Sequence, residues 1–167
     1  QKKYADLLPQ YPSIAYLEGT ARLSDGGVGV GDDSIWAPKI IIATGARPAV
    51  PPIPGLDKVS YLTSTSLLEL AALPKSLIVV GGGFIGAELA QMMARMGVAV
   101  TMVCRSRLLP QVEPEVSEAL ASAFRSEGIQ LFCGVAYEAC REDAKGVTLG
   151  VREGNALVEL QAERLLC

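Results

Sequence analysis

Histidine is missing from the sequence altogether. It is the usual general base of hydrolytic sites and a frequent zinc ligand, so its absence argues against Ser/His/Asp and Cys/His catalysis. The cysteines show neither a CxxC pair nor the spacing of metal ligands. We therefore expect no metal site and no residue that performs catalysis within this chain alone. Free cysteines commonly pack as small hydrophobic residues, and we expect this of all four: Cys104, Cys133, Cys140 and Cys167.

The sequence also lacks a long basic run and a long apolar run. Its net charge is −3, so nothing predicts a track for nucleic-acid phosphates. No apolar run reaches the roughly 18 residues of a membrane span, and the first residues lack the apolar core of a signal peptide. We expect a cytoplasmic protein with neither nucleic acid nor membrane as partner. Its 167 residues, half of them apolar, suit one domain and part of another.

The first part of the chain reads as short β segments separated by turns. The segments are residues 13–23, 27–30 and 34–43, and "SDGG" and "GDD" between them have turn composition. The pattern predicts a β-meander. Ile40 to Ala43 is apolar without alternation, which favours a strand covered on both faces.

A proline-rich connector, "ARPAVPPIPG", follows at residues 46–55. Proline fixes φ and removes a backbone donor, so we expect an extended segment and place a domain boundary at its end. The predicted domains are residues 1–55 and 56–167. A short helix with a Ser or Thr N-cap is expected before Pro74.

The second part has the pattern of an α/β fold. A strand from Leu77, a glycine loop, a helix over Phe84–Met96 and a strand over Val98–Val103 make one βαβ unit. A further helix runs between Pro114 and Gly128, and then come a strand, a hairpin and a last short strand. We predict a Rossmann-like domain, with a central parallel sheet and a β-meander.

The glycine loop "GGGFIG", residues 81–86, contains the pattern GxGxxG at Gly81, Gly83 and Gly86. It follows a strand and opens a helix, which is the context of a dinucleotide site. The first glycine permits the tight turn, the second admits a pyrophosphate and the third allows close packing. Free N–H groups and the helix dipole would face the phosphates. Gly82, Phe84 and Ile85 complete the predicted loop, whose alternative role is that of a tight strand-to-helix turn alone.

The end of the next strand indicates which nucleotide is bound. NAD-binding proteins usually offer Asp or Glu to the ribose hydroxyls there, whereas this chain has Cys104 followed by Arg105 and Arg107. Two guanidinium groups without a carboxylate suit a 2′-phosphate. We predict NADPH rather than NADH, and the alternative is that both arginines are solvated surface residues.

Two segments together resemble a known family. "IIIATGARPAVPPIPG", residues 40–55, and "LIVVGGGFIGAELA", residues 77–90, are similar to the class I pyridine nucleotide-disulfide oxidoreductases, which are flavoproteins that bind FAD and NAD(P). Residues 61–91, 103–110 and 124–139 most resemble the mercuric reductases in it. The resemblance implies an internal fragment. In that layout residues 1–55 end an FAD-binding domain, residues 56–167 are an incomplete NADPH domain, and the redox-active cysteine pair lies elsewhere.

The resemblance also implies residues for FAD. Ala43, Thr44 and Gly45 match the motif that passes the flavin at a strand end, and Ala21 matches a backbone contact to the FAD adenosine. Gly45 would otherwise serve only a turn, and Ala21 only the core.

On the nucleotide side, Phe84 stands where the family often has an aromatic gate, commonly tyrosine, over the flavin. The resemblance implies that Glu88 orients a lysine beside the nicotinamide, although an acid near a helix N-terminus is favoured by the dipole anyway. It also implies that the Val135 backbone contacts the adenine. The alternative for Val135 is plain strand core.

The implied reaction passes electrons from NADPH to FAD, to a cysteine pair outside this chain and finally to Hg(II), giving elemental mercury. Soft thiolates suit this soft metal. The resemblance implies a homodimer when full length, and an inactive fragment. Two alternatives remain: a sister disulfide reductase of the dihydrolipoamide dehydrogenase or glutathione reductase type, and a non-catalytic module that senses NADP(H).

Overall fold

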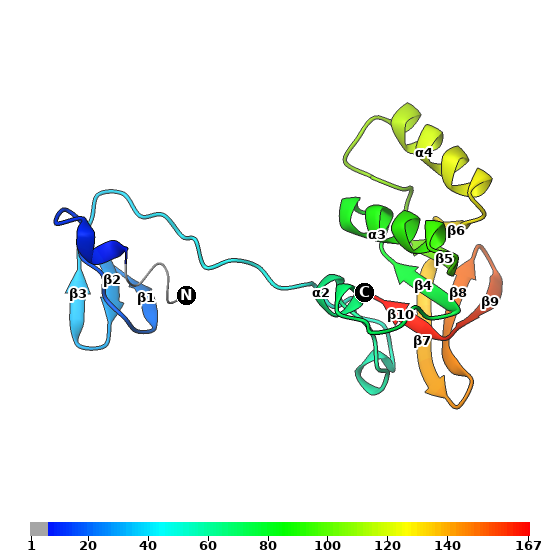
Figure 1. Cartoon of the computed structure of the whole chain (residues 1–167), viewed down its shortest axis with the longest axis horizontal. Coiled ribbons are helices and arrows are strands. Elements are labelled where there is room, and N and C mark those ends of the chain that lie inside the picture. Colours follow the sequence, from blue (N-terminus) through cyan, green and yellow to red (C-terminus); the bar gives the residue numbers. More distant parts are fainter. Residues whose placement is uncertain (1–6) are drawn as a thin grey trace. The chain divides into compact units, whose positions relative to one another are not determined.

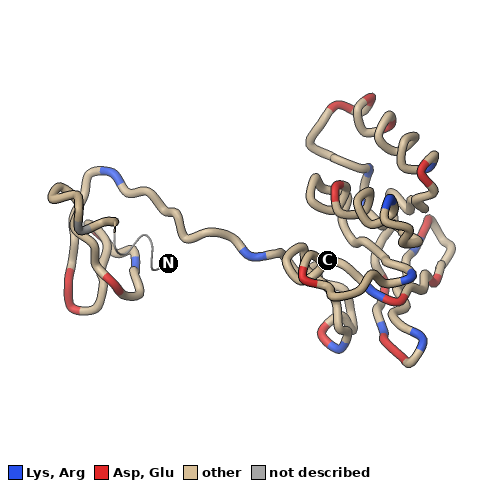
Figure 2. Tube along the Cα trace, viewed as in Figure 1, with Lys and Arg blue, Asp and Glu red and all other residues tan. Residues whose placement is uncertain are grey.

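The computed structural model describes residues 7–167, so the first six residues of the predicted first domain lie outside the described part. The chain divides into two compact units, Gln1–Ala46 and Arg47–Cys167 (Figure 1). None of the helices within residues 7–167 combines the length and apolar character needed to cross a bilayer. Acidic and basic residues are interspersed along both units (Figure 2).

The first unit contains the predicted meander. After the 3-10 helix η1 (Leu8–Gln10), three short strands form an antiparallel sheet in the order β1-β2-β3. Their bounds are β1 Ala21–Ser24, β2 Gly27–Val30 and β3 Asp33–Ile35. Gly26 and Gly31 adopt positive φ at the turns, a conformation that glycine takes without steric cost.

The predicted strand over Ile40–Ala43 is wrong. This segment has no regular secondary structure, and Ile41 is 91% exposed. A strand needs a neighbour to satisfy its backbone groups and to cover its side chains, and no strand within residues 7–167 pairs with this segment. Apolar composition alone therefore gives extended backbone here, without a sheet.

The second unit begins earlier than the predicted boundary at residue 55. Ile53 is buried in the core, and the N–H of Cys140 donates to the carbonyl oxygen of Pro54 at 2.8 Å. Gly55 has φ +84 and passes so close to the Cys140 carbonyl that a Cβ would collide with it. The end of the connector is thus packed into the second unit.

The second unit has the predicted α/β architecture. A parallel sheet in the order β10-β4-β5-β6 is accompanied by a three-stranded antiparallel sheet, β7-β8-β9, as Figure 1 shows. The elements are η2 Leu56–Lys58, α2 Ser64–Leu68, β4 Ser76–Val80, α3 Phe84–Arg95, β5 Ala99–Cys104, α4 Pro114–Ser126, β6 Gln130–Cys133, β7 Ala136–Asp143, β8 Gly146–Glu153, β9 Ala156–Ala162 and β10 Arg164–Leu166.

Both faces of the parallel sheet are covered. Leu77 and Val79 of β4 belong to a core cluster that includes Met93 of α3 and Phe124 of α4. Ile78, between them in sequence, belongs to the second cluster, with residues of β8. Side chains alternate across a strand, so helices cover one face and the antiparallel sheet covers the other.

Candidate nucleotide-binding site

The loop between β4 and α3 makes a tight turn at the carboxyl edge of the parallel sheet. Gly81 has φ +113, and its N–H donates to the carbonyl oxygen of Val103, at the end of β5, at 2.8 Å. A side chain rarely tolerates this backbone conformation. The first glycine of the pattern is thus explained by the turn itself.

The other two glycines of the pattern have different surroundings. A Cβ on Gly86 would lie 2.5 Å from the Gly81 carbonyl oxygen, so helix and strand approach closely only without a side chain. A Cβ on Gly83 would have no atom of the described residues within 4 Å. Gly83 also has φ −79, which any residue adopts. The fold therefore does not require glycine at position 83, and the space beside it is open.

The open space lies at the N-terminus of α3. Gly83 is the N-cap of this 12-residue helix and supplies no side-chain cap. Backbone hydrogen bonds within residues 7–167 leave the N–H groups of Phe84 and Ile85 without an acceptor. Such donors, together with the positive end of the helix dipole, form a site for a phosphate or another anion.

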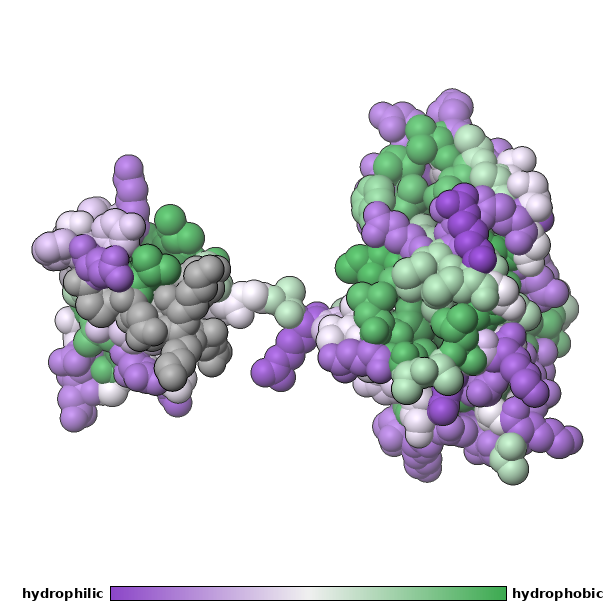
Figure 3. Space-filling view, viewed as in Figure 1, coloured by the Kyte–Doolittle hydropathy of each residue, from purple (hydrophilic) through white to green (hydrophobic). Residues whose placement is uncertain are grey.

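A largely apolar cleft of about 340 Å³ adjoins the loop. Phe84 and Ile85 are 53% and 63% exposed beside it, and Figure 3 shows hydrophobic surface on this unit. Exposed apolar side chains next to an anion site suit a ligand that joins a phosphate to a flat ring. The lining residues are Pro48, Ala49, Ser64, Val79, Val80, Gly81, Gly83, Phe84, Ile85, Gly86, Leu89, Leu166 and Cys167.

A second cleft, of about 410 Å³, contains both predicted arginines. Arg107 donates from Nη2 to the carbonyl oxygens of Pro110, at 3.2 Å, and Val112, at 2.7 Å. Arg105 makes no side-chain hydrogen bond or ion pair with the described residues. The two arginines are therefore not equivalent, because only Arg105 has all of its donors available for a ligand.

The loop after β5 is attached to the glycine loop. The N–H of Leu109 donates to the Gly82 carbonyl at 2.6 Å, and Leu109 itself has the unusual φ of +44. The buried Ser117 of α4 donates from Oγ to the Leu108 carbonyl at 2.6 Å. These bonds hold the arginine-bearing segment beside the turn.

Replacing Ser117 with alanine is expected to lower the free energy of unfolding by about 1–3 kcal/mol, because it leaves the buried Leu108 carbonyl without its donor. Urea denaturation measures the change. Ser126→Ala is the matched control, since the Ser126 hydroxyl bonds the Ala123 carbonyl on an exposed part of the same helix. Equal losses in the two variants would contradict the special role of Ser117.

Tyr137 is a residue that the sequence reasoning missed. Its hydroxyl donates at 3.3 Å to the Val103 carbonyl, which also accepts from Gly81, and its ring lines the arginine-bearing cleft. Burial raises the pKa of the Tyr137 hydroxyl to about 12, so it stays protonated and can donate. Tyr137 comes from β7, and no local motif connects that strand with the glycine loop.

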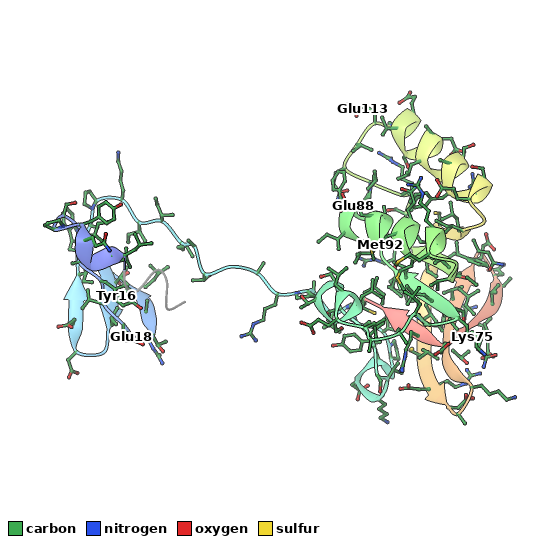
Figure 4. The ribbon with its side chains drawn as sticks, viewed as in Figure 1. Tyr16, Glu18, Lys75, Glu88, Met92 and Glu113 are labelled. Atoms are coloured by element: carbon green, nitrogen blue, oxygen red, sulfur yellow. The ribbon has the colours of Figure 1, made fainter. Side chains whose placement is uncertain are left out.

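The remaining nucleotide-side residues lie apart from the turn. Glu88 is exposed on α3 (Figure 4), over a separate hollow of about 200 Å³ that Phe84 and Phe124 also line. Val135 is 2% exposed, and its N–H donates to the Cys104 carbonyl at 3.3 Å. This N–H is therefore engaged within the fold.

The predicted FAD residues belong to the first unit. Ala21 begins β1 and is exposed, as are Ala43 and Thr44 in the segment without secondary structure. Gly45 has φ +78, which fits the predicted turn. Their role at a flavin stays a prediction.

Two of the cysteines lie close together. The Sγ atoms of Cys104 and Cys133 are 3.1 Å apart, and Cys104 is the donor. This hydrogen bond, helped by the charge of Arg125, lowers the pKa of Cys133 to about 7 against the effects of burial and of Glu118. The same bond and burial raise the pKa of Cys104. Within residues 7–167 no group of three or more Cys, Asp or Glu side chains is arranged to hold a metal ion.

Alkylation of Cys133 by iodoacetamide is expected to reach half its maximal rate near pH 7, because only the thiolate reacts and the pKa is about 7. Cys140 is the internal control, because burial raises its pKa. Both cysteines fall in the tryptic peptide 126–141, so fragment ions must separate them. Cys104→Ala should move the Cys133 midpoint to higher pH. A wild-type profile identical to that of Cys140 would contradict the assignment.

Comparison with known proteins identifies similar sequences over nearly the whole chain. The pyridine nucleotide-disulphide oxidoreductase profile matches residues 5–166. A mercuric reductase of Staphylococcus aureus is 38% identical over 168 residues, covering 99% of this chain and 30% of that protein. One from Bacillus cereus is 40% identical over 167 residues, covering 99% and 26%. The chain thus spans less than a third of the length of these relatives.

Solved structures show the same architecture. The Cu(II) complex of the HOCl-induced flavoprotein disulfide reductase RclA from Escherichia coli superposes with a TM-score of 0.76 at 30% identity, covering 99% of this chain and 38% of that one. An engineered water-forming NADPH oxidase bound to NADPH gives 0.66 at 28% identity, covering 74% and 29%. Its parent, an NADH oxidase from Lactobacillus brevis bound to NADH, gives 0.65 at 27%, covering 74% and 28%.

Proposed function

The chain belongs to the pyridine nucleotide-disulphide oxidoreductase family, and we propose that it is the NADPH-binding part of a flavoprotein that reduces Hg(II). In the proposal, residues 47–167 bind the nucleotide and residues up to 46 contribute to an FAD site. The observation that carries it is the open space beside Gly83, the cradle, at the N-terminus of α3, where the N–H groups of Phe84 and Ile85 have no backbone acceptor among residues 7–167.

The cradle fits a pyrophosphate. Gly83 leaves room for the backbone to approach the phosphates, and the N–H groups of Phe84 and Ile85 would donate to them. The exposed side chains of Phe84 and Ile85 would orient the nicotinamide and exclude water from its face. The bound nicotinamide and flavin supply the hydride transfer. Glu88 and Val135 stay in the proposal as candidate neighbours of the nucleotide.

Arg105 supports NADPH over NADH. Its guanidinium group is available in the second cleft, and none of the described residues that line this cleft carries a carboxylate. The engineered NADPH oxidase differs from its NADH-binding parent by five substitutions, and three consecutive ones introduce alanine, arginine and serine for aspartate, alanine and methionine. This chain has the segment Cys104-Arg105-Ser106 at the end of β5. Like the substituted segment of the NADPH oxidase, it contains arginine followed by serine and has no acidic residue.

Mercury as the final electron acceptor is supported by relatives named mercuric reductase at 37–40% identity over 99% of this chain. The thiol pair of the reaction would come from a part of the full-length protein outside this match, since soft thiolates suit Hg(II). Ala21, Ala43, Thr44 and Gly45 are the proposed flavin-side contacts. The structure of the disulfide reductase RclA supports a second candidate, in which a disulfide replaces mercury.

Two measurements test the proposal. The isolated chain should bind NADPH in a fluorescence titration, retain no stoichiometric FAD and reduce no mercury. The full-length protein should oxidise NADPH in proportion to the elemental mercury released from Hg(II). Rapid NADPH oxidation with oxidised glutathione or lipoamide, and none with Hg(II), would instead favour the second candidate. Homodimer formation and a cytoplasmic location of the full-length protein stay predictions, which sedimentation and fractionation would test.

A further inference from the structure

Two thiols lie side by side on neighbouring strands of the parallel sheet. Cys104 ends β5, Cys133 ends β6, and the two residues are register partners. Neighbouring strands lie about 4.8 Å apart, and disulfides join residues whose Cα atoms are about 4.4–6.8 Å apart. The Sγ atoms are already 3.1 Å apart, so bond formation needs only a small side-chain movement. Cys104 lies against Gly82 and lines the arginine-bearing cleft, but the proposed hydride transfer does not use the thiol pair.

We infer that Cys104 and Cys133 form a redox-active dithiol, which hydrogen peroxide or a related hydroperoxide oxidises to an interstrand disulfide. Cys133 is only partly buried, whereas Cys104 is 3% exposed. Access therefore assigns the first attack to Cys133. Cys104 is the resolving thiol, because it is buried and its sulfur lies only 3.1 Å from the Cys133 sulfur.

Besides the two thiols, the reaction needs only the peroxide and one proton from solvent. The Cys133 thiolate attacks one peroxide oxygen, the O–O bond breaks, and with one proton from solvent the products are Cys133 sulfenic acid and water. The Cys104 sulfur then attacks the Cys133 sulfur, its proton leaves with the hydroxyl group, and a second water is released. Two electrons pass from the thiols to the peroxide. The pKa values of the two thiols favour the same order. The pKa of Cys133 is lowered to about 7, whereas that of Cys104 is raised, so Cys133 is the thiol that ionises and attacks first.

The other two cysteines lack a neighbouring thiol of this kind. Cys140 belongs to the second core cluster and the partly buried Cys167 packs against it, but no contact between their sulfurs lies within hydrogen-bond distance. Burial raises the pKa of both, that of Cys167 to about 12. They serve as internal controls in the same molecule, exposed to the same oxidant.

The test treats the folded full chain with hydrogen peroxide, blocks free thiols with iodoacetamide and maps tryptic peptides without reduction. We expect peptide 96–105 linked to peptide 126–141, less two hydrogen atoms, and its release by dithiothreitol. Peptide 126–141 contains both Cys133 and Cys140, so the Cys140→Ser variant identifies the partner. That variant should keep the link, whereas Cys133→Ser and Cys104→Ser should each abolish it.

Circular dichroism of each variant separates loss of the link from loss of the fold, and the wild-type map stands even if a serine variant unfolds. The inference is overturned if, after peroxide treatment that oxidises a free thiol peptide, Cys104 and Cys133 are both recovered entirely in the alkylated form. It is also overturned if Cys133 proceeds to sulfinic acid while Cys104 stays free, or if the link forms through Cys140.

Discussion

Replacing Gly83 with aspartate is expected to lower NADPH affinity by about 100-fold or more, roughly 2.8 kcal/mol, while leaving the fold as stable as before or more so. Position 83 has an ordinary φ and open space, so a side chain meets no clash. Aspartate is a good N-cap and would bond the free N–H groups of α3. It therefore fills the cradle with a negative charge where the pyrophosphate would bind.

Fluorescence titration and thermal denaturation of the same Gly83→Asp preparation measure the two effects. Ala144→Asp adds the same charge on an exposed hairpin and should leave both unchanged. Gly86→Ala should instead lower thermal stability, because its Cβ would lie 2.5 Å from the Gly81 carbonyl oxygen. If Gly83→Asp binds NADPH as tightly as the unmodified chain does, the phosphates do not lie in this cradle.

Reversing the charge of Arg105 should separate the two nucleotides. Arg105→Glu is expected to weaken NADPH binding by about 30-fold to 100-fold and NADH binding by less than about threefold. A glutamate would repel the 2′-phosphate, which NADH lacks, and would also offer an acceptor to the ribose hydroxyls that bind NADH. We expect this loss of NADPH affinity at Arg105 because its guanidinium group makes no hydrogen bond with the described residues and is available to the 2′-phosphate.

Titrations of both nucleotides check the discrimination. Lys145→Glu makes the same change of net charge on the exposed turn of the β7-β8 hairpin and should alter neither affinity appreciably. Arg107→Ala should cost less than Arg105→Glu and should also loosen the segment before α4, since Arg107 bonds the Pro110 and Val112 carbonyls. Equal losses of NADPH and NADH affinity in Arg105→Glu would mean that this residue does not bind the 2′-phosphate.

The architecture of the second unit follows from local sequence signals. The apolar strands, the glycine turn and the helix from Phe84 have strong patterns, and the structure confirms the α/β fold with its parallel sheet and meander. Pro114 begins α4, and Gly128 follows it with φ +82, as the capping pattern indicates. These features depend on residues near each other in the sequence, so a single sequence suffices.

The features that were missed depend on contacts between distant segments. The hydrogen bond of Tyr137 to Val103 and the approach of Cys104 to Cys133 exist only once β5, β6 and β7 are assembled. The two arginines look alike in sequence and differ only through the carbonyls near Arg107. The strand expected over Ile40–Ala43 failed because a strand depends on a partner, which composition does not reveal.

We propose that main-chain amides at the start of α3 hold the diphosphate of NADPH. Amide proton–nitrogen correlation spectra of the chain, recorded during an NADPH titration, test this contact residue by residue. We expect the amides of Gly82 to Ile85 and of Arg105 to shift most, and the Gly83→Asp variant to lose these shifts. Saturation with NADPH while those amides stay unperturbed, and others shift instead, would contradict it.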